Sequence, residues 1–224
     1  MSIEIATAAD LDDVRNDLTA DYVQVNDIDL SGYSNWNPIG DSDNHFTGSY
    51  DGQNYTINNL TIVSDAEISN YQALFGYASG ATFQNMQFDN VNVDVVDSYV
   101  AALLGMSAYD ASAPCNIDNI KVHSGAIKGN TSIGAIIGEG DYATVKNCEV
   151  NINIYGRDND GWGSNYLGGI MGLAYYANID NCTYKGTIDA TAANSADYIG
   201  GIIGMLVENE VTNSDVIADI IGND

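Results

Sequence analysis

The sequence predicts an all-β fold, a right-handed parallel β-solenoid of about five to six coils with a short N-terminal capping helix. Three observations predict it: two short strings that recur along the chain, an alternation of apolar and polar residues, and a composition rich in turn residues. The 224 residues include 23 glycines and 26 asparagines but only 2 prolines. Glycine and asparagine are common in turns between short strands and are disfavoured inside helices.

The first recurring string ends in glycine after two apolar residues. It occurs as Ala73-Leu74-Phe75-Gly76, Ala102-Leu103-Leu104-Gly105, Ala135-Ile136-Ile137-Gly138, Gly169-Ile170-Met171-Gly172 and Gly201-Ile202-Ile203-Gly204. Successive final glycines are 29, 33, 34 and 32 residues apart. Such a period is the signature of a repeat architecture. Gly138 and Gly172 are expected to need either a positive φ or a close approach between coils.

The second recurring string has the pattern apolar-x-Asn-x and interleaves with the first. Its copies place asparagines at Asn59, Asn85, Asn119, Asn147, Asn181 and Asn213. We expect the first five of these asparagines, from Asn59 to Asn181, to stack in register and to hydrogen-bond to their equivalents or to turn backbone along the solenoid axis.

Apolar residues follow the last three of these asparagines at odd spacings, as half-buried strands require. They are Val150 and Ile154, Tyr184 and Ile188, and Val216 and Ile220. Ankyrin and tetratricopeptide repeats have similar periods but need two amphipathic helices per unit. Segments such as Gly186-Thr187-Ile188-Asp189-Ala190-Thr191 are β-branched and lack helical periodicity, which favours the solenoid.

A leader precedes the repeats and completes a recognisable combination. It contains residues 21–32, then Asn35-Trp36-Asn37-Pro38-Ile39-Gly40, then Phe46-Thr47-Gly48-Ser49-Tyr50-Asp51-Gly52. Leader and repeats together resemble the GLUG-motif repeat family of bacterial and viral surface proteins, which includes adhesins and haemagglutinin-like proteins. The resemblance implies surface adhesion, and it implies no catalytic residue.

The two ends of the solenoid must be covered, because a terminal coil exposes its core and its strand edges. Residues 1–20 are predicted to form a capping segment, with a helix over 8–19 that begins at a capping-box-like pair, Thr7 and Asp10. Residues 21–224 form the solenoid, whose last coil is incomplete. Two interpretations of the incomplete last coil remain open. Its edge is either blunted by acidic residues, or it docks onto a partner or onto a second copy of the chain, which would give a homo-oligomer.

The charge excludes two classes of partner. With 31 acidic and 6 basic residues, the formal net charge is −25, so nucleic acid and anionic membrane surfaces are not expected partners. Neither an export signal nor a membrane span is recognisable in this chain.

Three cysteines match neither a disulfide framework nor a zinc pattern. Cys148 and Cys182 follow the asparagine in consecutive repeats, so we expect them to be buried thiols of a core ladder.

Pairs of carboxylates are candidates for catalysis or for calcium binding. The pairs are Asp41 with Asp43, Asp94 with Asp97 and Asp158 with Asp160. With 25 aspartates in the chain, such pairs arise from composition, so no catalytic residue is assigned. Asp41, Asp43, Asp158 and Asp160 are weak candidates for Ca²⁺, and no cofactor is otherwise expected.

Tyrosine provides the functional signal, with 15 tyrosines against 4 phenylalanines. Several fall where the repeat predicts turns, and exposed aromatic rings beside Asp and Asn suit sugar recognition. The longest insertion in the repeat runs from 155 to 166, and insertions in solenoids often form the binding face. The predicted ligand-binding residues are Tyr155, Asp158, Asp160, Trp162, Asn165, Tyr166, Tyr175 and Tyr176.

The sequence therefore favours a non-enzymatic adhesion or receptor-recognition module located outside the cell, either as a virion component, such as a tail fibre or capsid decoration, or as part of a surface adhesin. Its expected partner is a glycan or protein on a cell surface, or a sibling surface protein. The alternatives are a polysaccharide-degrading enzyme, a glycoside hydrolase or lyase of the tailspike type, and a structural spacer.

Overall fold

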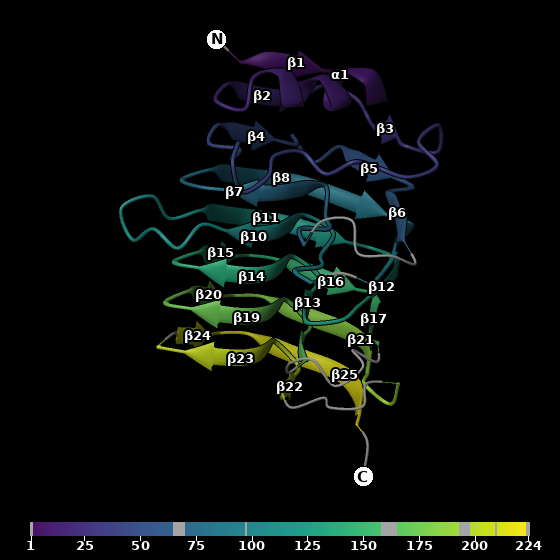
Figure 1. Ribbon diagram of the computed structural model, residues 1–224, viewed down its shortest axis with the longest axis vertical. Coiled ribbons are helices and arrows are strands. Elements are labelled where there is room, and N and C mark those ends of the chain that lie inside the picture. Colours follow the sequence, from purple (N-terminus) through teal and green to yellow (C-terminus); the bar gives the residue numbers. More distant parts are fainter. Residues whose placement is uncertain are drawn as a thin grey trace.

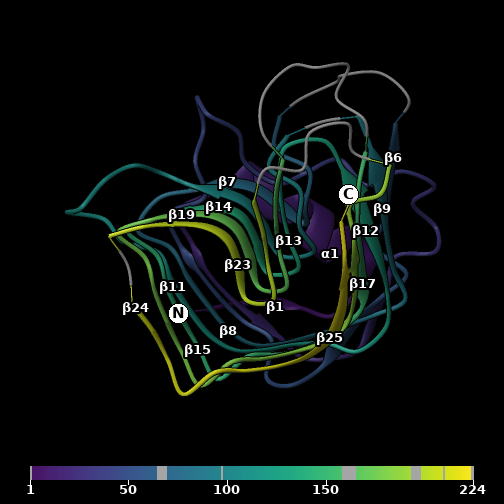
Figure 2. The same cartoon turned by 90° about the horizontal axis from the view of Figure 1, so that it is seen from below.

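The computed structural model describes residues 2–64, 70–96, 98–157, 165–192, 198–208 and 210–222. The predicted fold is confirmed: the chain is an all-β parallel solenoid of about six turns with one short helical segment at its N-terminus (Figure 1). In Figure 2 the C-terminal coil faces the viewer. The chain there runs counterclockwise and toward the viewer through β23, β24 and β25, so the solenoid is right-handed.

Three parallel sheets form the walls. The large sheet comprises β1 (Ile3–Ile5), β2 (Asp21–Gln24), β3 (Ile28–Asp29), β4 (Ser49–Asp51), β5 (Thr56–Asn58), β6 (Thr61–Ser64), β8 (Thr82–Asp89), β9 (Val91–Val95), β11 (Asn116–Val122), β12 (Gly125–Gly129), β15 (Thr144–Lys146), β16 (Glu149–Asn151), β17 (Asn153–Gly156), β20 (Asn178–Asp180), β21 (Thr183–Asp189), β24 (Glu210–Thr212) and β25 (Asp215–Ile221). The five-stranded sheet comprises β7 (Phe75–Ala78), β10 (Leu104–Ser107), β14 (Ile137–Asp141), β19 (Met171–Tyr175) and β23 (Ile203–Val207). The three-stranded sheet comprises β13 (Ser132–Gly134), β18 (Tyr166–Gly168) and β22 (Tyr198–Gly200).

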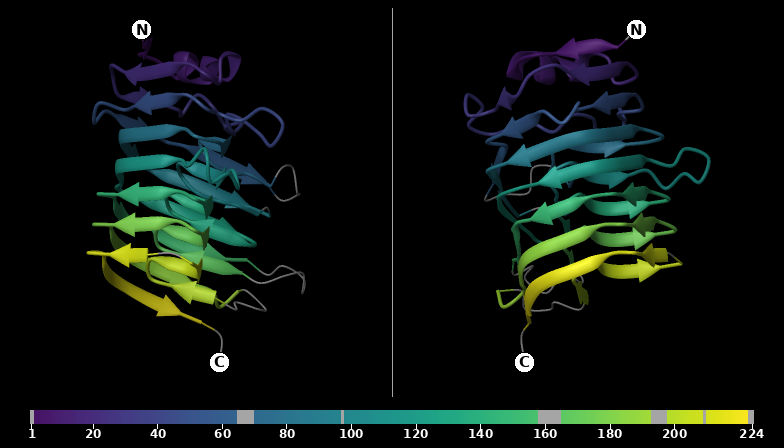
Figure 3. Two further views of the ribbon diagram at one scale, coloured as in Figure 1. Left: turned by 90° about the vertical axis from the view of Figure 1, so that its left-hand side faces the viewer. Right: turned by 180° about the vertical axis from the view of Figure 1, so that it is seen from behind.

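One coil passes through all three sheets, and the coils stack along the long axis (Figure 3). From β14 the chain turns into β15, β16 and β17 of the large sheet, crosses through β18, and begins the next coil at β19. Ile137 pairs with Met171, 34 residues later, and Met171 pairs with Ile203. The sequence period is therefore the length of one coil.

The recurring glycines mark the acute corner where the three-stranded sheet turns into the five-stranded sheet. A Cβ on Gly172 would lie 2.4 Å from the backbone N of Ile133, and one on Gly138 would lie 2.5 Å from the carbonyl carbon of Tyr99. Neither glycine has a positive φ. Of the two predicted reasons for glycine, close backbone approach is the one that applies.

The six asparagines of the second string, which we call the corner asparagines, all adopt a left-handed conformation. Their φ values lie between 49° and 63°, a region that asparagine and glycine tolerate best. Asn119 Nδ2 donates to Asn85 Oδ1 at 2.9 Å, and Asn181 Nδ2 donates to Asn147 Oδ1 at 2.8 Å. The predicted stacking is confirmed for Asn85, Asn119, Asn147 and Asn181. It is wrong for Asn59, which lies opposite Asn90 in another row, where Asn90 Nδ2 donates to Asn59 Oδ1 at 2.7 Å.

Aspartates of preceding coils complete this line of hydrogen bonds. Asn147 Nδ2 donates to Asp118 Oδ1 at 2.6 Å, and Asn213 Nδ2 donates to Asp180 Oδ1 at 2.8 Å. The hydrogen bond from Asn213 also lowers the pKa of Asp180. Some of the aspartates therefore stabilise the corners, because their carboxylates accept hydrogen bonds from asparagine side chains one coil away.

The two ends of the stack differ. At the N-terminus, α1 (Ala8–Asp12) and a 3-10 turn over Asp13–Asn16 lie on the first coil, with Leu11 and Val14 fully buried. Thr7 and Asp10 form the predicted capping box. The helical segment is shorter than predicted, and the preceding residues form β1, which pairs with β2. In the last coil, Val211, Val216 and Ile220 are 38%, 42% and 48% exposed, because within the described residues no further coil covers them.

Replacing Asn119 tests the corner asparagines. We expect Asn119→Ala to lower stability by about 2 kcal/mol, because alanine pays roughly 1–2 kcal/mol for the left-handed backbone and loses the axial hydrogen bonds. Asn119→Gly should lose less, since glycine tolerates the backbone. Thermal unfolding measures both variants. Equal losses would show that backbone conformation does not select the residue.

Candidate functional site

Three tyrosines form a partly exposed cluster at the turn that leads from the five-stranded sheet into the large sheet. We call Tyr109, Tyr142 and Tyr176 the tyrosine cluster. The rings of Tyr142 and Tyr176 stack with centroids 4.9 Å apart and an interplanar angle of 10°. Tyr109 packs edge-on against both, at 5.3 Å and 6.3 Å, and is 62% exposed. Tyr142 and Tyr176 are half-buried, so Tyr109 is the ring of the cluster most exposed to solvent.

Two of these tyrosines have a backbone conformation that is unfavourable for their residue type. Tyr142 and Tyr176 have φ values of 51° and 54°, which are uncommon for bulky side chains. Backbone hydrogen bonds between coils fix both turns, from Tyr142 N to the Tyr175 carbonyl at 2.9 Å and from Tyr176 N to the Val207 carbonyl at 3.0 Å. A hydrogen bond with Tyr109 also raises the pKa of Tyr142 to about 12. Backbone strain of this kind collects at functional positions.

Two carboxyl groups are buried on β14, on the outer face of the five-stranded sheet. Glu139 is 9% exposed and Asp141 is 2% exposed. Ser132 Oγ of the neighbouring three-stranded sheet donates to Glu139 Oε2 at 3.5 Å. Asp141 Oδ1 has no hydrogen-bond partner among the described residues. Burial raises the pKa of Glu139 to about 7, with Asp141 adding to the shift, and burial raises that of Asp141 to about 6.

Tyrosines from several coils surround this carboxyl pair. The rings of Tyr71 and Tyr99 stack at 5.4 Å. Burial raises the pKa values of Tyr71, Tyr99 and Tyr175, and the charge of Glu139 raises them further. The pair can therefore hold protons near neutral pH inside an aromatic environment.

Sequence reasoning missed Glu139 and Asp141. The available signal was positional: Met106 and Leu173 pair with Glu139 in the adjacent coils, so an acid replaces apolar residues at one repeat position. Composition masked that signal, because many aspartates and glutamates stand two residues from another acid.

The predicted site residues lie in separate places. Tyr155 is on β17 and Tyr166 begins β18, where it stacks on Tyr198 at 5.3 Å. Asn165 is fully buried, and its Nδ2 donates to the Arg157 carbonyl at 3.5 Å. Tyr175 lies beside the carboxyl pair, whereas Tyr176 belongs to the tyrosine cluster. Asp158, Asp160 and Trp162 lie outside the described residues, so their part in ligand binding stays a prediction.

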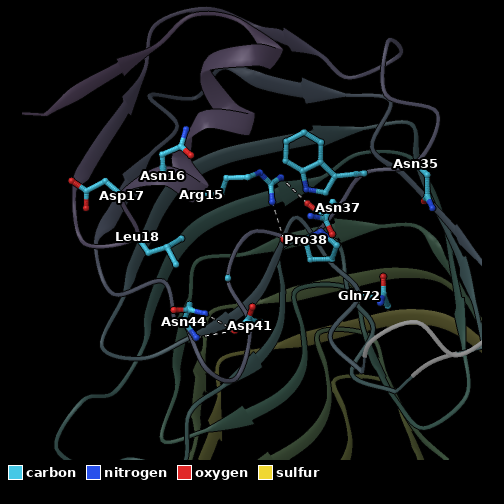
Figure 4. Close-up of a pocket in the computed structure, with 12 residues that line it drawn as sticks. Arg15, Asn16, Asp17, Leu18, Asn35, Asn37, Pro38, Asp41, Asn44 and Gln72 are labelled. Atoms are coloured by element: carbon cyan, nitrogen blue, oxygen red, sulfur yellow. Dashed lines mark hydrogen bonds between the residues drawn. The ribbon is translucent and has the colours of Figure 1, made fainter.

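A polar pocket of about 820 Å³ lies between the N-terminal cap and residues 35–44 (Figure 4). Arg15 crosses it and donates to Asp12 Oδ1 at 2.6 Å and to the Asn37 carbonyl at 2.9 Å. Its guanidinium lies 5.7 Å from the ring centroid of Trp36. The guanidinium is thus occupied in attaching the cap to the first coils.

Asp41, a weak calcium candidate, lines the same pocket. Its Oδ1 accepts the backbone N–H groups of Asp43 and Asn44 at 2.9 Å and 2.8 Å, forming a turn. Among the described residues, no three His, Cys, Asp or Glu side chains are grouped so as to hold a metal ion. Calcium binding at Asp41 and Asp43 stays a prediction.

Comparison with known proteins supports the resemblance predicted from the repeats. Residues 163–189 match the GLUG motif, so the chain carries this motif. It is 36% identical over 131 residues to a provisionally named Gly-rich membrane protein of Evansella cellulosilytica, and 32% identical over 149 residues to halomucin of Haloquadratum walsbyi. These alignments cover 54% and 61% of the chain, but only 14% and 2% of the relatives.

A solved structure shares the fold. The crystal structure of a provisionally named immunoglobulin A1 protease from Bacteroides ovatus superposes with a TM-score of 0.73 at 20% identity, covering 100% of this chain and 68% of that one. At this identity the likeness concerns the fold alone. Within the described residues, no helix is long and apolar enough to cross a membrane.

A pH titration of stability tests the carboxyl pair. A carboxyl whose pKa is higher in the folded state binds more protons when folded, so unfolding becomes easier as pH rises from its ordinary pKa to its folded one. We therefore expect the melting temperature to fall between about pH 4 and about pH 7, the range from the ordinary to the folded pKa values of Glu139 and Asp141. Glu139→Gln should flatten this decline and raise the melting temperature near pH 8 by on the order of 5 °C.

This pH range distinguishes the Glu139 and Asp141 pair, whose pKa values are raised, from carboxyl groups whose pKa values are lowered. Hydrogen bonds lower the pKa values of the following aspartates, whose contribution is lost only as pH falls below about 4: Asp10, Asp17, Asp29, Asp41, Asp51, Asp110, Asp180 and Asp189. Glu210→Gln, at an exposed position, is the control for removing one negative charge. If both variants shift the curve equally, general charge repulsion accounts for the effect.

Proposed function

We propose that the chain is a non-enzymatic recognition module of a surface protein, and that it binds a glycan through the tyrosine cluster. The observation that carries the proposal is the set of three packed rings on one turn of successive coils, of which Tyr109 is exposed and Tyr142 and Tyr176 are half-buried. Aromatic faces stack on the C–H faces of sugars, and neighbouring polar groups bind the hydroxyls.

The surroundings of the cluster fit this ligand class. The formal charge of −25 disfavours anionic ligands, whereas a neutral or basic glycan pays little electrostatic cost. Rings held by backbone hydrogen bonds lose little conformational entropy on binding. The spacing of stacked coils, ~4.8 Å, is of the order of one sugar ring, so an extended chain could contact several rings.

The relatives' names support a surface location rather than a virion one. One relative is named as a Gly-rich membrane protein, and the other is named halomucin. A role as a recognition module on a cell surface is therefore our proposal, with the virion location as its alternative. We assign no hydrolytic chemistry to the Glu139 and Asp141 pair, since Asp141 is 2% exposed.

Binding by variants that keep the backbone tests this proposal. Tyr142→Asn and Tyr176→Asn remove the rings but place in each turn the residue that best tolerates its φ. We expect the double variant to lose at least tenfold in affinity on a glycan array, as for an aromatic anchor, with a melting temperature within a few degrees of the wild type.

Tyr55→Asn is the matched control, because Tyr55 is 38% exposed and lies outside the cluster. It should bind like the wild type. Retained binding by the double variant would refute the cluster as the contact surface. Shortening of a bound polysaccharide would instead favour the depolymerase alternative.

A further inference from the structure

Two thiols lie opposite each other in successive coils. Cys148 and Cys182 each follow a corner asparagine, Asn147 and Asn181. The register on both sides is fixed, since Lys146 pairs with Asp180 and Glu149 pairs with Thr183. Thr183 N also donates to the Cys148 carbonyl at 2.8 Å. The two cysteines therefore occupy the same rung of adjacent strands.

Their separation suits a covalent bond. Neighbouring strands lie ~4.8 Å apart, within the Cα separation of roughly 4.4–6.8 Å found in disulfides. Both side chains point into the core, at 2% and 0% exposure. Cys148 Sγ donates to the Lys146 carbonyl at 3.1 Å, and Cys182 Sγ donates to the Asp180 carbonyl at 3.4 Å.

The two thiols differ in acidity. The neighbouring Cys148 thiol lowers the pKa of Cys182, whereas burial raises the pKa of Cys148 well above its ordinary value. We therefore write Cys182 as the attacking thiol, since the thiolate is the reactive form.

We propose that Cys148 and Cys182 are an oxidation site that closes into a disulfide between adjacent coils, with a peroxide as oxidant. The Cys182 thiolate attacks one peroxide oxygen, the O–O bond breaks, and a sulfenic acid and hydroxide form. Cys148 sulfur then attacks the Cys182 sulfur, and the hydroxyl leaves. The hydroxide and the leaving hydroxyl take up the two thiol protons. In sum, two thiols and one hydrogen peroxide give one disulfide and two waters.

The third cysteine provides an internal control. Cys115 is also buried and free, but the register at Asn116 places it opposite Ala81 and Ala143 rather than a cysteine. It should take no part in the cross-link. Closing a loop between positions 148 and 182 restricts the unfolded chain, so oxidation should stabilise the fold.

The test is oxidation of the folded protein with hydrogen peroxide, followed by removal of the oxidant, thiol counting in denaturant and peptide mapping without reductant. We expect the thiol count to fall from three to one, with a cross-linked peptide joining Cys148 to Cys182 that is lighter by two hydrogen atoms. The melting temperature should rise by about 5 °C or more. Dithiothreitol should reverse all three changes.

Variants assign the bond. Cys115→Ala should keep both the cross-link and the stabilisation, whereas Cys148→Ala and Cys182→Ala should each abolish them. If an alanine variant fails to fold, the mapped peptide of the wild type still decides. Three remaining thiols after oxidation, a sulfinic acid at Cys182 without a cross-link, a disulfide that includes Cys115, or a cross-link formed only in denatured protein would overturn the proposal.

Discussion

The left-handed asparagine at one corner of each coil is the constraint on which the rest of the solenoid depends. It bends the chain where a Cβ-bearing residue other than asparagine would pay roughly 1–2 kcal/mol. Its side chain reaches the neighbouring coil, as from Asn119 to Asn85 and from Asn181 to Asn147. One residue type thus sets both the bend within a coil and the register between coils. Core rows such as Val145, Ile179 and Val211 follow from that register.

The fixed corners leave other turns free to carry function. Tyr142 and Tyr176 lie in the turn that follows the five-stranded sheet, at the end away from the glycine corner. Their backbone adopts the same left-handed conformation as the corner asparagines. Rings in such positions are held by the coils that flank them. A solenoid therefore converts one repeated turn into a row of aligned side chains, as a flat binding surface requires.

The same close stacking has a cost at the acute glycine corner. Backbone approaches so closely there that Gly138 and Gly172 admit no Cβ, and side chains beside the corner lose contact with water. Glu139 and Asp141 are buried beside this corner. Asp141 Oδ1 has no hydrogen-bond partner in the described part of the chain. A protein that carries 31 acidic residues keeps two of them where the neutral form is preferred, which couples the packing of this corner to pH.

The coil length could be predicted from the spacing of the repeated strings, and the strand and turn order and the capping box from patterns of residues near one another in the chain. The sequence also indicated that tyrosines gather at turns. The contact of Tyr176 with Tyr109 and Tyr142, and the place of its neighbour Tyr175 by Glu139, became visible only in the folded chain. The burial of the carboxyl pair was likewise visible only there, whereas the repeat already placed Cys148 and Cys182 at equivalent positions of successive coils. The tyrosine and carboxyl contacts join residues about one coil apart or more, and their geometry follows from register and sheet angle, which no local pattern encodes.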